Sequence, residues 1–302
     1  MPRQAPHTGW AIAALLVNAL VWGLSWWPFK RLESLGLHPL WATAIVYGLS
    51  FGAIALWSRL ARLPAAAWRA HPGLWFLLLA SGLTNVGFNW AVTVGDVVRV
   101  VLLFYLMPAW SVLIAWWLLD ERPSPGALMR LLLALSGLGI VLHQPGNPWP
   151  LPDSLADVLA LLGGFSFALT NALLLKLRHT PESSRMLAMF GGGALMASLT
   201  ALLGSGSALV VQTQLCNSAW VGPVLALALA FLGGNLALQY GAARLSAHTT
   251  ALVMLSEVVF ASVSSVILGA SHWDTRTLLG GALILLAALL SVAMPSRTKE
   301  ST

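Results

Sequence analysis

The stretch LWFLLLASGLTNVGFNWAVTV, residues 74–94, runs for 21 residues without a charged side chain. A helix rises about 1.5 Å per residue, so about 20 mainly apolar residues are needed to cross the roughly 30 Å hydrocarbon core of a bilayer. A strand of a membrane barrel would instead alternate apolar and polar residues over a short segment. The stretch therefore predicts a membrane-spanning helix.

Similar apolar stretches follow one another along the chain in both directions. Of the 302 residues, 58% are hydrophobic and 9% are charged, whereas an ordinary soluble domain has about 25% charged residues. The composition therefore excludes a soluble globular protein and predicts an all-α membrane protein with ten transmembrane helices. Charged residues, prolines and glycines divide the chain into spans at about 10–29, 39–57, 74–94, 97–119, 126–142, 155–176, 185–204, 219–240, 247–268 and 277–294.

Lysine and arginine residues are distributed unevenly between the two sides of this predicted bundle. One side, with both termini, holds 12 of the 16, and the other holds only Lys30, Arg31, Arg99 and Arg276. Because basic residues are enriched in cytoplasmic loops, we expect a multi-pass protein of the cell inner membrane with both termini in the cytoplasm. On the sparsely charged side, Arg99 is expected to form a local ion pair with its neighbour Asp96.

An internal repeat relates the two halves of the sequence. A shift of 150 residues places Asn85 on Asn235, Asn89 on Gln239 and Trp90 on Tyr240. Each repeat has five predicted helices, so the second copy enters the membrane from the opposite side, as in the inverted repeats of transporters. The predicted division is a first repeat at 1–142, an extracytoplasmic linker at 143–154, a second repeat at 155–294 and a cytoplasmic tail at 295–302.

Polar side chains within the predicted spans are the first candidates for a binding site, because polar groups are unfavourable in hydrocarbon. Ser81, Asn85 and Asn89 share one helix face, and Asn235 and Gln239 repeat the spacing in the second half. These amides bind either a polar substrate or neighbouring helices. Glu257 is the one acid well inside a span, and three roles remain open for it: binding an ammonium group, carrying a coupling proton, or stabilising the structure.

Aromatic residues and a proline add to the candidate site. Several of the 15 tryptophans lie near span ends and are expected to be interfacial anchors. Pro108 lacks the N–H that would bond the carbonyl of Phe104, so it predicts a kink that serves either gating or ordinary packing. The remaining predicted substrate-binding residues lie on spans expected to line a cavity: Asn18, Trp22, Trp26, Trp90, Tyr105, Trp110, Asn171, Tyr240 and Phe260.

Other functional classes lack their sequence signals. The seven histidines have no metal-ligand spacing on one helix, and no phosphate-binding loop or serine-hydrolase motif occurs. We therefore expect no metal, no cofactor, no nucleic-acid partner and no enzymatic activity. A membrane-embedded transferase would need a cluster of acids or histidines at one membrane face, and the sequence has no such cluster. A membrane scaffold that transports nothing remains the other alternative.

The residue pattern resembles the drug/metabolite transporter superfamily of the EamA type. The resemblance rests on the ten helices in two inverted repeats, on Trp22-Gly23 before Lys30, and on Pro108 followed by Asp120-Glu121-Arg122-Pro123. Within that superfamily the chain is most similar to bacterial aromatic amino acid exporters. The resemblance implies a central cavity lined by helices one, three, four, six, eight and nine, with Glu257 at the position of the family's acid, although Val258 replaces the proline that often follows it.

The resemblance also implies a function. The chain is expected to export aromatic and other apolar amino acids from the cytoplasm by alternating access between the two repeats, with the lipid bilayer as its surroundings. Efflux of hydrophobic or cationic drugs is the alternative from the same superfamily.

Overall fold

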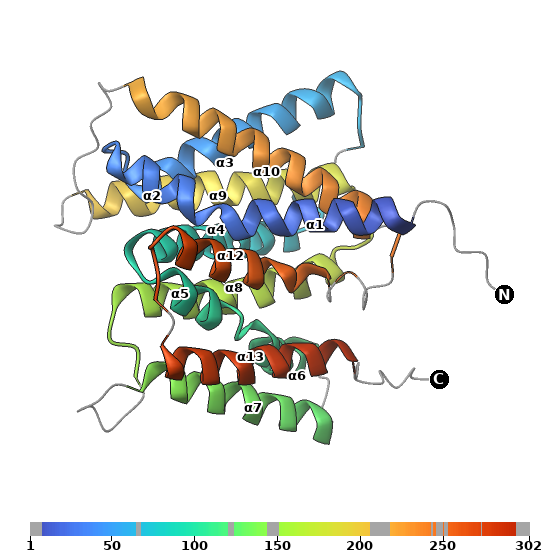
Figure 1. Cartoon of the computed structure of the whole chain (residues 1–302). Coiled ribbons are helices and arrows are strands. Elements are labelled where there is room, and N and C mark those ends of the chain that lie inside the picture. Colours follow the sequence, from blue (N-terminus) through green and yellow to red (C-terminus); the bar gives the residue numbers. More distant parts are fainter. Residues whose placement is uncertain are drawn as a thin grey trace, which may run out of the picture.

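The structure is a computed structural model that describes residues 8–64, 68–119, 124–143, 151–205, 218–242, 244–245, 250, 253–272 and 274–293. All regular secondary structure in this part of the chain is helical (Figure 1). The helices are α1 (Thr8–Leu24), α2 (Trp26–Ser34), α3 (Pro39–Leu60), α4 (Gly73–Val94), α5 (Val97–Phe104), α6 (Met107–Leu119), α7 (Pro125–Leu142), α8 (Leu155–Lys176), α9 (Glu182–Gly204), the 3-10 turn η1 (Ser218–Trp220), α10 (Val221–Ala242), α12 (Ser256–Ile267) and α13 (Thr275–Ala293).

These helices form ten apolar segments, so the protein is an all-helical membrane protein. Eight segments are long and apolar enough to cross a bilayer, and α12 and α13 are shorter apolar helices. Two of the eight combine consecutive helices: α1 with α2, and α5 with α6. The described helices match the predicted spans closely, although part of the ninth, predicted at 247–268, lies outside the described residues. Large apolar side chains such as Leu60, Leu203 and Ile267 are at least three-quarters exposed on the outside of the bundle, as a lipid-facing surface requires.

Capping residues set where several helices begin. The hydroxyl of Ser154 accepts the backbone N–H of Asp157 at 3.1 Å, and that of Ser124 accepts the N–H of Ala127 at 3.2 Å. Pro125, in the first turn of α7, has no N–H to leave unpaired. The carboxylate of Asp96 accepts the backbone N–H of Arg99 at 2.9 Å and so caps α5. These caps satisfy backbone donors that would otherwise be unpaired at the membrane boundary.

The centre of the bundle is α4, which packs against α8 on one side and α9 on another. Glycines bring the helices together. A Cβ added at Gly192 of α9 would lie 2.1 Å from the carbonyl oxygen of Leu78, and one at Gly193 would lie 2.3 Å from the ring of Tyr47. The Gly191-Gly192-Gly193 run is therefore a packing motif of the kind that small residues form in membranes.

The helices α7 and α13 also cross at closely packed glycines. A Cβ at Gly137 would lie 2.6 Å from the carbonyl oxygen of Gly280, and a Cβ at Gly280 would lie 2.6 Å from that of Gly137. The residues one turn further along, Val141 and Ile284, also make matching contacts. This crossing is reciprocal, as in the interface of a symmetric dimer.

Three of the apolar segments are interrupted near their middles. A turn at Ser25 separates α1 from α2, and Tyr105 and Leu106 separate α5 from α6. A turn at Leu255 precedes α12. The second interruption comes just before Pro108, which cannot donate to the carbonyl of Phe104. Irregular backbone at membrane depth is tolerated where it is buried in protein or lines a cavity, so the interruptions point to the middle of the bundle as the place for a site.

Candidate functional site

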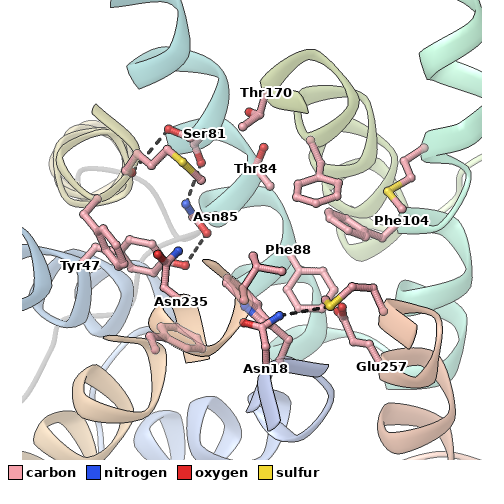
Figure 2. A pocket seen from close by; sticks show the side chains of 18 of the residues that line it. Asn18, Tyr47, Ser81, Thr84, Asn85, Phe88, Phe104, Thr170, Asn235 and Glu257 are labelled. Carbon is pink, nitrogen blue, oxygen red and sulfur yellow. Dashed lines mark hydrogen bonds between the residues drawn. The ribbon is translucent and has the colours of Figure 1, made fainter. Parts of the chain in front are cut away.

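A cavity of about 140 Å³ lies in the middle of the bundle, beside the interruptions of the fourth and ninth segments. It is comparable to an apolar cavity of about 150 Å³ that accepts benzene. Figure 2 shows its side chains converging from both halves of the chain. Its lining residues are Asn18, Trp22, Tyr47, Ser81, Thr84, Asn85, Phe88, Phe104, Tyr105, Met107, Phe167, Thr170, Met189, Phe190, Phe231, Asn235, Leu238, Met254 and Glu257.

One wall of the cavity carries its acid. The hydroxyl of Tyr105, in the interruption between α5 and α6, lies 3.1 Å from Oε2 of Glu257 and 3.4 Å from the carbonyl oxygen of Met254. The Nδ2 of Asn18 donates to the sulfur of Met254 at 3.4 Å. Its Oδ1 and the hydroxyl of Thr170 have no hydrogen-bond partner among the described residues. The broken fourth segment thus places a phenol against the carboxylate of α12, whereas Thr170 lies across the cavity beside Thr84 (Figure 2).

Another wall carries neutral polar groups. The hydroxyl of Tyr47 donates to Oδ1 of Asn85, whose Nδ2 donates to the carbonyl of Ser81 at 2.8 Å. Across from them, Nε2 of Gln239 donates to Oδ1 of Asn235 at 2.7 Å. Figure 2 shows Tyr47, Asn85 and Asn235 gathered on the side away from Glu257. These amides therefore bond neighbouring groups, and Asn85 and Asn235 also face the cavity, so their binding of a substrate stays a prediction.

Aromatic residues from both halves of the chain also line the cavity. The rings of Trp22 and Phe231 are stacked, with centroids 4.7 Å apart and planes 18° apart. The rings of Phe88 and Phe104 meet edge to face at 4.8 Å. Such walls favour a ligand with an apolar, ring-bearing body, because rings stack on one another at these distances.

The charge of the lining is one-sided. Among the described residues of the lining, Glu257 is the only carboxylic acid, and none is a lysine, arginine or histidine. Two basic groups on the Arg99 side of the bundle are engaged elsewhere. Nζ of Lys30 donates to the carbonyl of Gly95 at 3.2 Å, and the guanidinium of Arg99 is bound to Asp157. The cavity therefore has an acceptor for a cation and no cationic partner for an anion.

Arg99 closes the end of the bundle at which α5 and α8 begin. Its Nε and NH2 donate to the two carboxylate oxygens of Asp157 at 2.8 and 2.9 Å, and its NH1 donates to the carbonyl of Val141 at 2.9 Å. The hydroxyl of Ser271 accepts the backbone N–H of Val97 at 3.1 Å. The predicted ion pair of Arg99 with Asp96 is therefore wrong: Asp96 caps the helix, and the guanidinium reaches the second half of the chain instead.

The structure brings six of the predicted substrate-binding residues together at the cavity: Asn18, Trp22, Asn85, Tyr105, Asn235 and Glu257. Pro108 follows the interruption beside the cavity, and its gating role stays a prediction.

The other predicted residues lie outside the lining. Three are buried between the cavity and the Arg99 end: Nε1 of Trp26 donates to Oγ of Ser264 at 3.0 Å, Nδ2 of Asn89 donates to Oγ1 of Thr43 at 3.2 Å, and Trp90 meets the His38 ring at 5.7 Å. The rest lie to the sides: Trp110 meets Phe165 edge to face, Asn171 is exposed, Gln239 bonds Asn235, Tyr240 lies under the guanidinium of Arg244, and Phe260 packs at Gly23.

Residues that the sequence did not single out complete the lining. Thr84 and Phe88 follow Ser81 at helical spacing, so the face that carries Asn85 already indicated them. Tyr47 of α3 and Met189 and Phe190 of α9 add the second and seventh segments to the six that the resemblance implies. No sequence signal distinguished these residues from ordinary apolar contacts. Among the described residues, no group of three or more metal-ligating side chains gathers.

Comparison with known proteins gives three findings. The sequence profile of the EamA-like transporter family matches residues 9–143. An uncharacterized transporter of Pseudomonas aeruginosa is 31% identical over 167 residues, which cover 50% of this chain and 50% of that protein, so the match spans about half the length of this curated relative. A crystal structure of a protein with 19% sequence identity covers 94% of this chain and 96% of its own, with a TM-score of 0.55, a likeness of fold alone.

Proposed function

We propose that this chain is a secondary transporter that exports aromatic and other apolar amino acids across the bacterial inner membrane, and the match of residues 9–143 to the EamA-like transporter family supports this proposal. The observation that carries the proposal is the central cavity, which combines aromatic walls with one carboxylate and several amides. Such a cavity suits a small molecule with an apolar body and an ammonium group.

Two inverted five-helix repeats, at 1–142 and 155–294, are part of the proposal. The helix contacts support it, since α4 packs on α8 as α10 packs on α1, and α5 and α6 pack on α8 as α12 packs on α1. Three further contacts join corresponding segments: α3 with α9, α5 with α12, and α7 with α13. A two-fold relation between the halves produces this set of contacts, and transporters use such halves for alternating access.

The cavity lies nearer one end of the bundle than the other. The residues that α8, α9 and α10 contribute are close to Lys176, Glu182 and Ala242, where those helices meet the side predicted to be cytoplasmic. The opposite end is closed by Arg99 with Asp157. Helix α1 begins, and α13 ends, at the same end of the bundle (Figure 1). With the termini in the cytoplasm, this arrangement is a state that loads substrate from inside.

Flux measurements on purified protein in proteoliposomes test the proposal. Labelled phenylalanine or tryptophan should move in a saturable, protein-dependent way, both with and without a pH gradient. Empty liposomes and liposomes that contain an unrelated membrane protein are the controls. Absence of saturable flux for both amino acids, under either condition, would contradict the proposal.

Replacing Glu257 by glutamine is expected to lower this flux by at least about tenfold. The carboxylate would hold the ammonium of the substrate in a site with no other charge, and loss of one partner of a buried, hydrogen-bonded pair costs about 2–5 kcal/mol. Glutamine keeps the size of the side chain and can still accept from Tyr105. Glu182→Gln is the matched control, because Glu182 is exposed at the start of α9; equal flux in both variants would show that Glu257 does not bind substrate.

Efflux of hydrophobic cations is the second candidate function. It is favoured by the same charge pattern, in which an acid lines the cavity without a basic residue. Flux of a labelled aromatic cation, inhibited by phenylalanine in the same proteoliposomes, would place both substrates in one site. Cells that show resistance unaffected by Glu257→Gln would argue against this alternative.

A further inference from the structure

We infer that the cavity selects its substrate by the ammonium group and disfavours a carboxylate, so that amides and amines of aromatic amino acids bind better than the free amino acids. This inference rests on the proposed function, because it concerns the substrate of the same cavity. Its ligand class is an apolar or aromatic monocation whose second polar group is neutral.

The distribution of charged groups is the first step. Every described lysine and arginine lies outside the cavity lining, and Glu257 is the one carboxylate within it. Lys30 and Arg99 are bound to a backbone carbonyl and to Asp157 at the closed end. The phenol of Tyr105 contacts the carboxylate of Glu257, and the amide of Asn18 and the thioether of Met254, which bond each other, also line the cavity. None of them compensates a second negative charge.

The charge balance is the second step, and it depends on the ionised carboxylate of Glu257. With that carboxylate present, a zwitterionic amino acid leaves its own carboxylate without a partner, whereas a monocation makes the filled cavity neutral. A charge without a partner is strongly unfavourable in a buried, largely apolar site. The monocation with ionised Glu257 is therefore the best-matched occupant.

The neutral wall is the third step, because it provides for the other end of such a ligand. Oδ1 of Asn235 already accepts from Gln239, and Oδ1 of Asn85 from Tyr47. Nδ2 of Asn85 donates one hydrogen to the carbonyl of Ser81, and the hydroxyl of Thr84 donates to the carbonyl of Ala80. The amide therefore keeps a second hydrogen and the hydroxyl keeps its acceptor lone pairs, beside the amide of Asn235 in the lining. They match a carboxamide, an ester or a hydroxyl, which needs hydrogen bonds and no counter-charge. The rings of Trp22, Phe88 and Phe231 also line the cavity, and the apolar body of the ligand would pack against them.

The test is calorimetric titration of the purified full chain with four ligands of nearly equal shape: phenylalanine, phenylalanine amide, 2-phenylethylamine and 3-phenylpropanoate. The titrations are run at a mildly acidic pH, at which the amines are charged. We expect the amide and the amine to bind at least about tenfold more tightly than phenylalanine, and 3-phenylpropanoate to bind most weakly. In the Glu257→Gln variant, the preference for the amide over phenylalanine should fall to within about twofold.

The outcomes separate the inference from the proposed function. Phenylalanine that binds as tightly as its amide, or a preference that persists in a folded Glu257→Gln variant, would overturn the inference. The comparison of the four ligands on the unaltered protein stands even if that variant does not fold. Saturable phenylalanine flux with no preference for the amide would support the proposed function and contradict the inference. The expected binding preference without any flux would support the inference and contradict the proposed transport function.

Discussion

Replacing Arg99 by glutamine is expected to lower the free energy of unfolding by about 3–5 kcal/mol, the usual effect of removing one partner from a buried ion pair. The side chain of Asp157 is only 1% exposed, and both of its carboxylate oxygens accept from Arg99. Glutamine cannot supply the paired donors of the guanidinium. The contact with the Val141 carbonyl would also be lost, so three segments would come apart at this end. Thermal unfolding in detergent, followed by circular dichroism, measures the change.

Two variants make this result specific to the buried pair. Arg31→Gln is the control, because Arg31 is exposed on α2 at the same end of the bundle and should change stability little. Adding Asp157→Asn to Arg99→Gln should restore part of the loss, since the uncompensated buried carboxylate is then gone. If Arg99→Gln and Arg31→Gln unfold at the same temperature, the ion pair does not hold this end closed.

Replacing Gly192 by leucine is expected to abolish the folded protein. The first added carbon alone would lie 2.1 Å from the carbonyl oxygen of Leu78 and 2.9 Å from the hydroxyl of Ser81. The atom it meets first is backbone in the middle of α4, which cannot move without separating α4 from α9. Because α4 also contributes four residues to the cavity lining, binding would be lost together with the fold. The yield of monodisperse protein after size-exclusion chromatography measures the outcome.

Gly52→Leu is the matched control for that change. Gly52 lies on the exposed face of α3, and an added Cβ there would meet nothing within 4 Å. It should therefore be recovered in the same amount as the unaltered protein, since leucine favours both the helix and a lipid-facing surface. Comparable yields of the two variants would mean that the α4–α9 contact is less close than described.

The ten apolar segments were predictable because bilayer thickness fixes the length of a span. A stretch of that length without charged residues, such as 74–94, therefore indicates a transmembrane helix. The interruptions were less accessible. Pro108 indicates the one in the fourth segment, and Pro28 stands three residues after the turn at Ser25, where it cannot donate to the carbonyl of Leu24. Residues 253–260 contain no proline, so the turn at Leu255 has no such signal. A single segment also does not encode contacts between helices, which is why the pairing of Arg99 with Asp157, 58 residues away, could not be predicted.

The candidate site was predictable to the extent that polarity marks it. Asn18, Asn85, Asn235 and Glu257 stand out as polar residues in apolar segments, and all four line the cavity. Aromatic residues were harder to place, because a ring is equally at home in a core, a cavity or an interface. Trp26 and Trp90 were therefore predicted to bind substrate, but they are buried towards the Arg99 end. Phe231 lines the cavity although no nearby polar residue indicated it.

The reciprocal crossing of Gly137 with Gly280 has a consequence for how this chain evolves. Each glycine leaves room for the backbone of the other, and each is followed one turn later by a branched apolar residue in the matching place. A larger residue at either position would clash with the backbone of the other helix, so natural selection constrains the two positions jointly. Among descendants of this chain, we expect both positions to remain glycine or to be substituted together.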